Sequence, residues 1–150
     1  MAEYAFNRQA LYDYEILEKY EAGLALAGLE VKAIRTGHIS LKGAYVATQG
    51  EEAFLLNANI PPYQMKNTPA WYEPTRSRKL LLHKAEIRSL LGKTQQKGLT
   101  LVPLRVYNKS GKIKLEFALA KGKKEYDKRQ KIGEREAKRK IQRALRGKIK

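Results

Sequence analysis

Cysteine is absent from the 150 residues of this chain, and histidine occurs only twice. The chain therefore has no disulfide framework, no thiolate nucleophile and no cysteine-based zinc site, and two histidines cannot form a His-rich metal site. No apolar run approaches the roughly 20 residues that a membrane-spanning helix needs. The first residues lack the charged and then apolar order of a signal peptide. We therefore expect a soluble, cytoplasmic protein without a metal or cofactor.

Acidic residues are also scarce relative to basic ones, with 15 against 31 and a formal net charge of +16. A polyanionic partner would relieve the repulsion among so many like charges. Residues 1–120 hold 17 Lys and Arg against 11 Asp and Glu, whereas residues 121–150 hold 14 against 4. We therefore predict a globular body over residues 1–120 and a basic tail over residues 121–150. Nucleic acid is the first candidate partner and an anionic membrane surface the second.

The body carries hydrophobic patterns of two periods, which predict both strands and helices. We expect strands over residues 12–26, 44–48, 52–56, 99–107 and 112–120, and helices over residues 28–37 and 77–91. The proline-rich stretch from Asn57 to Pro74 is predicted to be a loop, and Asn108–Gly111 a hairpin turn. This order favours a strongly curved antiparallel β-sheet with flanking helices, and an OB-like barrel is its natural closure.

The tail carries one narrow apolar stripe, formed by Ala137, Ile141, Ala144 and Leu145. Isolated helices of this length are marginal in water. We therefore predict a tail that is disordered in the free protein and helical on a partner. An unspecific solubilising tail is the alternative, and so narrow a stripe makes membrane binding less favourable.

No arrangement of acid, base and nucleophile predicts catalysis, and no glycine-rich phosphate loop is present. We therefore expect a binding protein with no catalytic residues, not an enzyme. Nine tyrosines on a basic body can stack on unpaired bases, although we expect most of them to pack in the core.

Several motifs in one order carry a family resemblance. They are Asn7-Arg8 with Ala10, Asp13-Tyr14, YEAGLALAGLEVKAIRTG, PTRSRKLLL and AKGKKEYDKR. Together they resemble the small protein B family, the SsrA- or tmRNA-binding proteins of bacterial trans-translation. The resemblance implies an OB-like barrel whose tail becomes helical in the ribosome.

The same resemblance implies a function and a set of partners. The body would bind the tRNA-like domain of tmRNA and deliver this RNA to stalled ribosomes. The tail would enter the empty mRNA channel next to small-subunit rRNA, and a fully helical 30-residue tail spans about 45 Å. Elongation factor Tu, bound to aminoacylated tmRNA, would be an indirect partner.

Ten residues of the body are predicted to bind tmRNA: Asn7, Arg8, Glu21, Lys32, Arg35, Arg76, Arg78, Lys79, Leu81 and Lys114. The resemblance places Glu21, Leu81 and Lys114 at positions that support tmRNA binding in the family. Lys114 can neutralise a phosphate, whereas Glu21 must accept from a base or orient a basic neighbour. Leu81 either packs on a base or seats its helix.

Five further cations of the body are candidates on physical grounds. Lys32 and Arg35 lie near one another on the first expected helix and can grip the RNA backbone together. Arg76, Arg78 and Lys79 crowd the expected start of the second helix, where amide donors attract phosphate. A solvated face is the alternative for these cations.

In the tail, the predicted contacts with the decoding site and mRNA channel are Gly122, Lys123, Lys124, Tyr126, Asp127, Lys128, Arg129, Lys138 and Arg139. Tyr12 and Tyr126 stand where many relatives have histidine, and Ala33 where many have serine. Two rival classes remain, a general RNA-binding or ribosomal protein with a basic tail and an RNA-processing enzyme.

Overall fold

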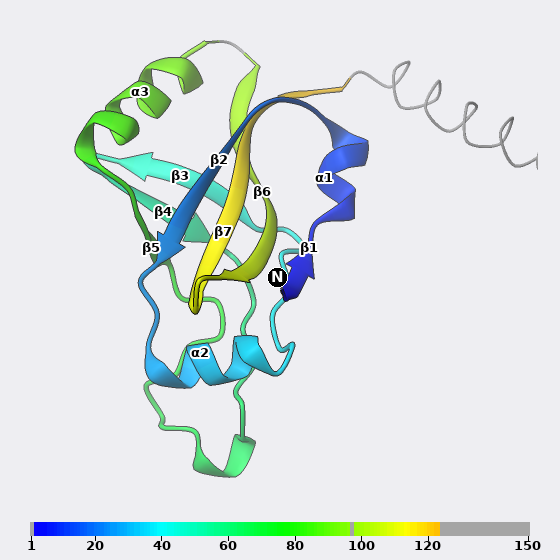
Figure 1. Cartoon of the computed structure of the whole chain (residues 1–150), viewed down its shortest axis with the longest axis vertical. Helices are drawn as coiled ribbons and strands as arrows, with labels where there is room; N and C mark the ends of the chain where they lie inside the picture. Colours follow the sequence, from blue (N-terminus) through cyan, green and yellow to red (C-terminus); the bar gives the residue numbers. More distant parts are fainter. Residues whose placement is uncertain (1, 97, 124–150) are drawn as a thin grey trace, which may run out of the picture.

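The computed structural model of the chain describes residues 2–96 and 98–123 (Figure 1). Its elements in chain order are β1 (Glu3–Phe6), α1 (Arg8–Asp13), β2 (Tyr14–Leu24), α2 (Gly28–Arg35), β3 (Tyr45–Gln49), β4 (Glu52–Leu56), the 3-10 helix η1 (Met65–Asn67), β5 (Arg78–Leu81), α3 (Lys84–Thr94), β6 (Leu99–Lys109) and β7 (Lys112–Gly122). Within these ranges no helix is both long and apolar enough to cross a membrane.

The strands form one antiparallel sheet in the order β1-β6-β3-β4-β5-β2-β7, and β7 pairs back onto β6. Six strands therefore close into a ring, while β1 pairs only with β6. Two joints of the ring are thin: β3 meets β6 through the single pair Val46–Leu101, and β2 meets β5 through two residue pairs. The expected OB-like antiparallel architecture is confirmed, with a barrel that is partly open at these joints.

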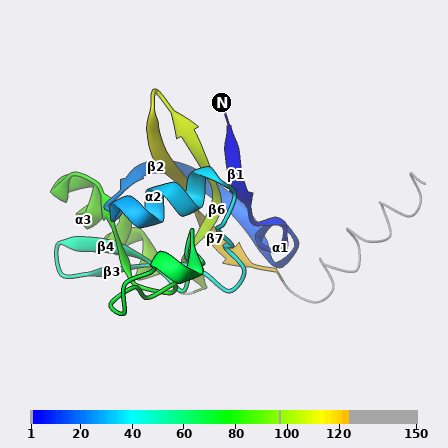
Figure 2. The same cartoon turned by 90° about the horizontal axis from the view of Figure 1, so that it is seen from below.

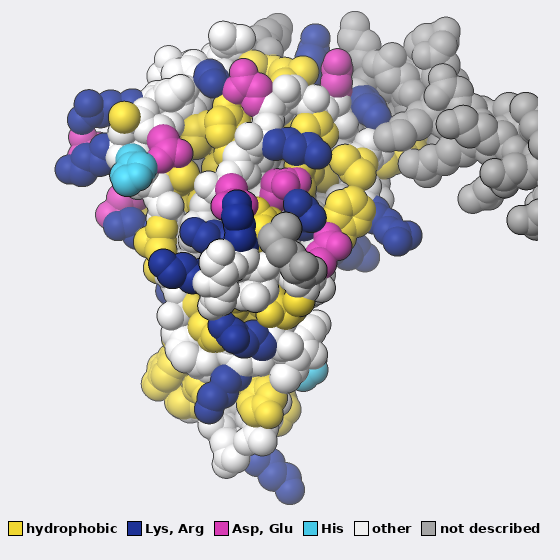
Figure 3. Space-filling model, viewed as in Figure 1, with side chains coloured by type: hydrophobic (Ala, Val, Ile, Leu, Met, Phe, Trp, Pro, Cys, Tyr) yellow, Lys and Arg dark blue, Asp and Glu magenta, His cyan; other side chains and the backbone are white. Residues whose placement is uncertain are grey.

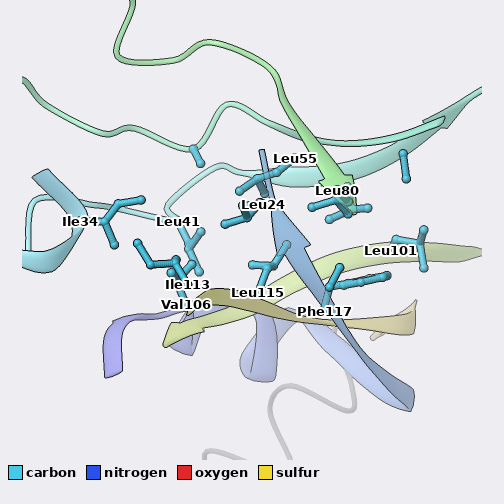
Figure 4. Close-up of a cluster of buried hydrophobic side chains, with 14 of the residues drawn as sticks. Leu24, Ile34, Leu41, Leu55, Leu80, Leu101, Val106, Ile113, Leu115 and Phe117 are labelled. Atoms are coloured by element: carbon cyan, nitrogen blue, oxygen red, sulfur yellow. The ribbon is translucent and has the colours of Figure 1, made fainter. Parts of the chain in front are cut away.

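The interior of the ring is a hydrophobic core of inward-facing strand residues (Figure 4). Leu55, Leu80, Leu115 and Phe117 are almost completely buried there. The two longer helices lie at opposite ends of the sheet, with α2 at one end and α3 at the other (Figure 1). Ile34 of α2 joins the core at its end, so the core also fixes the position of α2.

Most of the expected elements are present near their expected bounds. The helix predicted over residues 28–37 is α2, and Gly37 follows it with a φ of +86° that favours glycine. The hairpin between β6 and β7 turns at Ser110 and Gly111, whose φ angles of 53° and 77° are both left-handed. Two successive left-handed residues are typical of the tight turns that match strand twist.

The helix predicted over residues 77–91 is wrong in its first half. Residues Arg78–Leu81 form β5, and α3 begins only at Lys84 and continues past Gly92 to Thr94. β5 alternates between buried and exposed residues and pairs with β4 on one side and β2 on the other. Strand partners distant in sequence therefore outweigh the local helical pattern.

The N-terminal part also differs from expectation, because β1 and α1 were not predicted. Tyr12 lies in α1, and the strand expected over residues 12–26 runs from Tyr14 to Leu24. Asn7 caps α1, since its side-chain oxygen accepts from the amide of Ala10 at 3.3 Å. The first two residues of the expected strand, Tyr12 and Asp13, therefore belong to a short capped helix instead.

Candidate nucleic-acid interface

A row of four residues crosses four adjacent strands on the outer face of the barrel. Cross-strand pairing places Leu81 of β5 opposite Gly23 of β2, Gly23 opposite Lys114 of β7, and Lys114 opposite Tyr107 of β6. Opposed residues share one face of a sheet. Because Gly23 has no side chain, the row is hollowed between Leu81 and Lys114. A Cβ atom at Gly23 would lie 3.2 Å from Cδ1 of Leu81.

This hollow is part of a groove of about 330 Å³ between the barrel, α2 and the β6–β7 hairpin. Val31 and Arg35 of α2 form one wall, and Lys112 of the hairpin belongs to the other. Arg35 also donates from Nη2 to the carbonyl of Gly111 at 3.1 Å, which fastens α2 to the hairpin tip. Lys and Arg side chains gather on this face around the hairpin tip and α2 (Figure 3).

The groove therefore brings together three of the predicted residues, Arg35, Leu81 and Lys114. Lys112 lines it as well and was missed by sequence reasoning. Its signal was present in the turn sequence NKSGK, because a hairpin between apolar strands must expose the cations at its tip.

Glu21 lies beside the groove in a small polar cluster. Its carboxylate accepts from the hydroxyl of Tyr107 and from Nζ of Lys109 at 3.2 and 3.4 Å. The hydrogen bond from Tyr107, helped by the charges of Lys109 and Lys114, holds the pKa of Glu21 below its ordinary value. Glu21 is therefore ionised at neutral pH. Its contacts favour the interpretation that it orients basic neighbours.

Tyr107 is the buried member of this cluster and was not predicted. Burial, together with the hydrogen bond to Glu21, raises the pKa of its hydroxyl, which therefore stays protonated and donates. The guanidinium carbon of Arg105 lies 4.7 Å from the centre of its ring. Tyr107 is thus a buried hydrogen-bond donor that fixes the position of the Glu21 carboxylate.

The residues of β5, Arg78–Leu81, alternate between the two faces of the sheet. Arg78 and Leu80 face inward, whereas Lys79 and Leu81 face outward. The predicted phosphate contact of Arg78 is corrected on this ground, because its side chain is 0% exposed. The prediction that amide groups at the start of a helix help these residues to attract phosphate is also wrong, since Arg78 and Lys79 lie in a strand. Lys79 is exposed and pairs with Glu52 at 3.4 Å.

Arg78 instead belongs to a buried ion cluster centred on Glu30 of α2. Nε and Nη2 of Arg78 lie 2.7 and 2.6 Å from Oε2 of Glu30, and Nη2 of Arg76 lies 2.5 Å from Oε1. Burial raises the pKa of Glu30, but the bonds from Arg76, the Ala27 amide and Arg78 outweigh it, so the net shift is downward. The cluster joins α2 to β5.

The other predicted residues lie outside the groove. Asn7 fastens α1 to β6, since Nδ2 donates to the carbonyl of Pro103 at 2.9 Å, and Arg8 is exposed beside it. Figures 1 and 2 both show α1 apart from α2 and the hairpin tip. Lys32 is exposed on α2, next to the loop that precedes β5.

Only two of the predicted tail contacts are among the described residues. Gly122 ends β7 opposite Tyr14, and the backbone N–H of Lys123 donates to the carbonyl of Asp13 at 2.8 Å. Nζ of Lys123 also donates to the carbonyl of Leu11 at 3.1 Å. Lys124, Tyr126, Asp127, Lys128, Arg129, Lys138 and Arg139 lie outside the described residues. The division into body and tail remains a prediction, although β7 continues past Ala120.

Cations at the two ends of the barrel differ in their ion pairing. Near α3, Lys84 and Arg88 pair with Glu51 at 3.3 and 3.2 Å, and Lys93 pairs with Glu18 at 2.8 Å. At the α2 end, four cations form no ion pair with any residue of the described ranges: Lys32, Arg35, Lys112 and Lys114. Unpaired cations that converge on a groove attract a polyanion. Across residues 2–96 and 98–123, no cluster of three or more His, Asp or Glu side chains could hold a metal ion.

Comparison with known proteins gives a consistent match over nearly the whole chain. The family model described as SmpB protein matches residues 4–147. A protein of Trichodesmium erythraeum named SsrA-binding protein is 55% identical over 139 residues, covering 93% of this chain and 89% of that protein. One of the same name from Sulfurihydrogenibium sp. is 53% identical over 149 residues, covering 97% and 95%.

A solved structure described as "tmRNA-SmpB: a journey to the center of the bacterial ribosome" is also similar. Its matching chain is 52% identical in sequence and superimposes with a TM-score of 0.66. The match covers 80% of this chain and 84% of that one.

Proposed function

The chain belongs to the SmpB protein family, and we propose that it binds the tRNA-like domain of tmRNA and brings this RNA to stalled ribosomes in the bacterial cytoplasm. The observation that carries the proposal is the groove between α2, β5 and the hairpin, where unpaired cations converge on an exposed leucine. The names of the relatives, SsrA-binding proteins, and the subject of the similar solved structure support the choice of RNA.

In this proposal each part of the groove has its own role. Arg35, Lys112 and Lys114 neutralise phosphates, which supplies affinity and orients the RNA without reading its sequence. Leu81 packs on the face of a base or on a ribose beside the space that Gly23 leaves open. Glu21 does not contact phosphate; its ionised carboxylate holds Lys109 in place beside the groove.

The tail has a separate role in the proposal. Residues 121–150 carry a net charge of +10, and a polycationic segment suits a channel formed by rRNA. We propose that this segment enters the empty mRNA channel and contacts the decoding site, while elongation factor Tu holds the aminoacylated end of tmRNA.

The test is a binding titration with the tRNA-like domain of tmRNA and an unrelated folded RNA, each at low and moderate salt. We expect a preference for the tRNA-like domain that survives the higher salt, because contact geometry adds to charge. Lys114→Ala should weaken this binding, whereas Lys84→Ala, which removes an ion-paired cation at the α3 end, serves as the matched control.

Two outcomes would contradict the proposal. Equal affinities for both RNAs that fall together with salt would favour a general RNA-binding protein. Cleavage of RNA on incubation with Mg²⁺ would favour an RNA-processing enzyme.

A further inference from the structure

The loop between β4 and β5 exposes three large apolar side chains. Tyr63, Met65 and Trp71 are 40%, 80% and 66% exposed. Apolar groups gathered on a surface mark an interaction site more often than isolated ones do. The groove described above does not include these residues, so the proposed RNA contacts of the groove leave them unexplained.

A second cavity lies between this loop and α2. Its volume is about 170 Å³, and its lining includes Leu29, Lys32, Tyr63, Asn67 and Tyr72. No residue that lines it within the described ranges is acidic. The cavity thus combines an aromatic wall, an amide side chain and an unpaired cation, which is the combination that binds a nucleotide: a ring to stack on, a polar edge to bond and a charge for the phosphate.

The cavity is held firmly in place by the barrel. The hydroxyl of Tyr72 donates to the carbonyl of Ile60 at 2.8 Å, and the amide of Ile60 donates to the carbonyl of Pro74 at 2.9 Å. Nη2 of the buried Arg78 donates to the same Pro74 carbonyl at 2.9 Å. A site fixed in this way loses little entropy when a ligand binds.

The cavity is also next to the groove. Arg35 lines the groove and Lys32 lines the cavity, and both are on α2 three residues apart. Side chains at this spacing are neighbours on a helix surface, roughly 5–6 Å apart at Cβ. A polynucleotide backbone bound in the groove can therefore pass over α2 from one cation to the other.

We propose that the cavity between α2 and the β4–β5 loop is a second nucleotide site, which takes one unpaired base of the RNA bound in the groove. The base stacks against Tyr63, and Lys32 neutralises its phosphate. Trp71 lies next to this site, because its ring centre is 6.3 Å from that of Tyr72, which lines the cavity. Asn67 donates to Gln64 at 2.9 Å, which leaves Oδ1 of Asn67 as an acceptor and Nε2 of Gln64 as a donor for the edge of the base. This inference rests on the proposed function, because the RNA is the same.

The single tryptophan of the chain makes the test direct. Trp71 is the only tryptophan, so its fluorescence reports on this loop alone. We expect titration with the tRNA-like domain of tmRNA to quench this fluorescence over the concentration range in which filter binding saturates. Tyr63→Ala should weaken binding roughly 5- to 150-fold, the range found when a stacking ring is removed. Tyr63→Phe, which keeps the ring, should bind like the wild type.

A matched control removes an equally exposed apolar side chain at the other end of the barrel. Leu91 on α3 is 39% exposed, and Leu91→Ala should leave RNA binding unchanged. Thermal unfolding of each variant identifies loss of fold. If Tyr63→Ala does not fold, Lys32→Ala with the tryptophan readout decides, with weaker binding expected.

The outcomes separate this inference from the proposed function. Specific RNA binding with unchanged Trp71 fluorescence and full affinity of Tyr63→Ala would overturn the second site and leave the proposed function intact. Full affinity of Tyr63→Ala for the tRNA-like domain with loss of ribosome association would identify a surface that contacts the ribosome instead, and would also overturn it. No preference of the wild type for the tRNA-like domain would overturn both.

Discussion

Glu30→Gln should destabilise the fold more than any loss of a surface charge. Glu30 is 2% exposed and its carboxylate accepts from Arg78, Arg76 and the amide of Ala27, while Arg78 is 0% exposed. The substitution keeps the shape of the side chain and removes its charge. It therefore leaves a buried guanidinium without its counter-ion.

Breaking a buried ion pair by removing one partner costs about 3–5 kcal/mol. The whole free energy of unfolding of a small domain is about 5–15 kcal/mol, so the variant should lose a large share of its stability. The additional bonds of Arg78 to the carbonyls of Ala58 and Pro74 remain, at 2.7 and 2.9 Å. They solvate the guanidinium partly and place the expected loss toward the lower end of that range.

Urea denaturation followed by circular dichroism measures this loss. The control is Glu51→Gln, because Glu51 pairs with Lys84 and Arg88 on the exposed surface and its loss should scarcely move the unfolding midpoint. A Glu30→Gln variant that unfolds at the midpoint of the wild type would refute the reasoning, since the buried charge would then need no partner.

The same cluster predicts a dependence of stability on pH. The pKa of Glu30 is lowered in the folded protein. Its contribution is therefore complete above the pKa of the unfolded carboxyl group, about 4.3, and is lost as the pH falls through the folded pKa. The stability difference between the wild type and Glu30→Gln should accordingly begin to shrink below about pH 4 and disappear only below the folded pKa of Glu30, where both side chains are neutral.

The other predictions concern the interface. Lys112→Ala and Lys114→Ala should each weaken binding to the tRNA-like domain. In titrations across salt concentrations, each should also lower the slope of log affinity against log salt by about one. An unchanged slope would show that the lysine does not contact a phosphate. Leu81 is 56% exposed, so Leu81→Ala should weaken RNA binding severalfold with little change in the unfolding midpoint. If RNA affinity and the unfolding midpoint fall together, Leu81 only helps to pack its strand. Truncation after Lys123 should preserve tmRNA binding and abolish peptide tagging on stalled ribosomes, whereas loss of binding would argue against separate body and tail.

Local sequence signals were sufficient where an element contains its own determinants. The β6–β7 hairpin is predictable because two alternating apolar runs flank a turn that accepts left-handed residues at Ser110 and Gly111. The helix α2 is predictable because its buried Ala33 and Ile34 lie on one side and Gly37 follows it. Neither element needs a distant partner to reveal its type.

The errors occur where distant residues decide. Residues 77–91 resemble one amphipathic helix with Leu80, Ile87 and Leu91 on its apolar stripe. Pairing with β4 nevertheless makes the first part, Arg78–Leu81, a strand. The same distance hides the role of Arg78, whose partner Glu30 is 48 residues away. Sequence reasoning treats an arginine in a basic motif as exposed, since an unpaired buried arginine is costly, and cannot identify the carboxylate that pairs with it.

The strand assignment also explains why one basic motif contributes so little to the interface. Of its cations, Arg78 is buried, Arg76 is paired with Glu30 and Lys79 is paired with Glu52. The net charge counts these cations equally with Lys112 and Lys114. A cation that is already paired with a carboxylate nevertheless binds a phosphate less favourably than an unpaired one, because it must first lose its interaction with that carboxylate. In the proposed function, the body therefore attracts RNA mainly at the α2 end, because of where its acidic residues lie. Glu18, Glu51 and Glu52 pair with cations toward the α3 end, and a polyanion that approaches the barrel is drawn to the groove, where Arg35, Lys112 and Lys114 form no ion pair within the described residues.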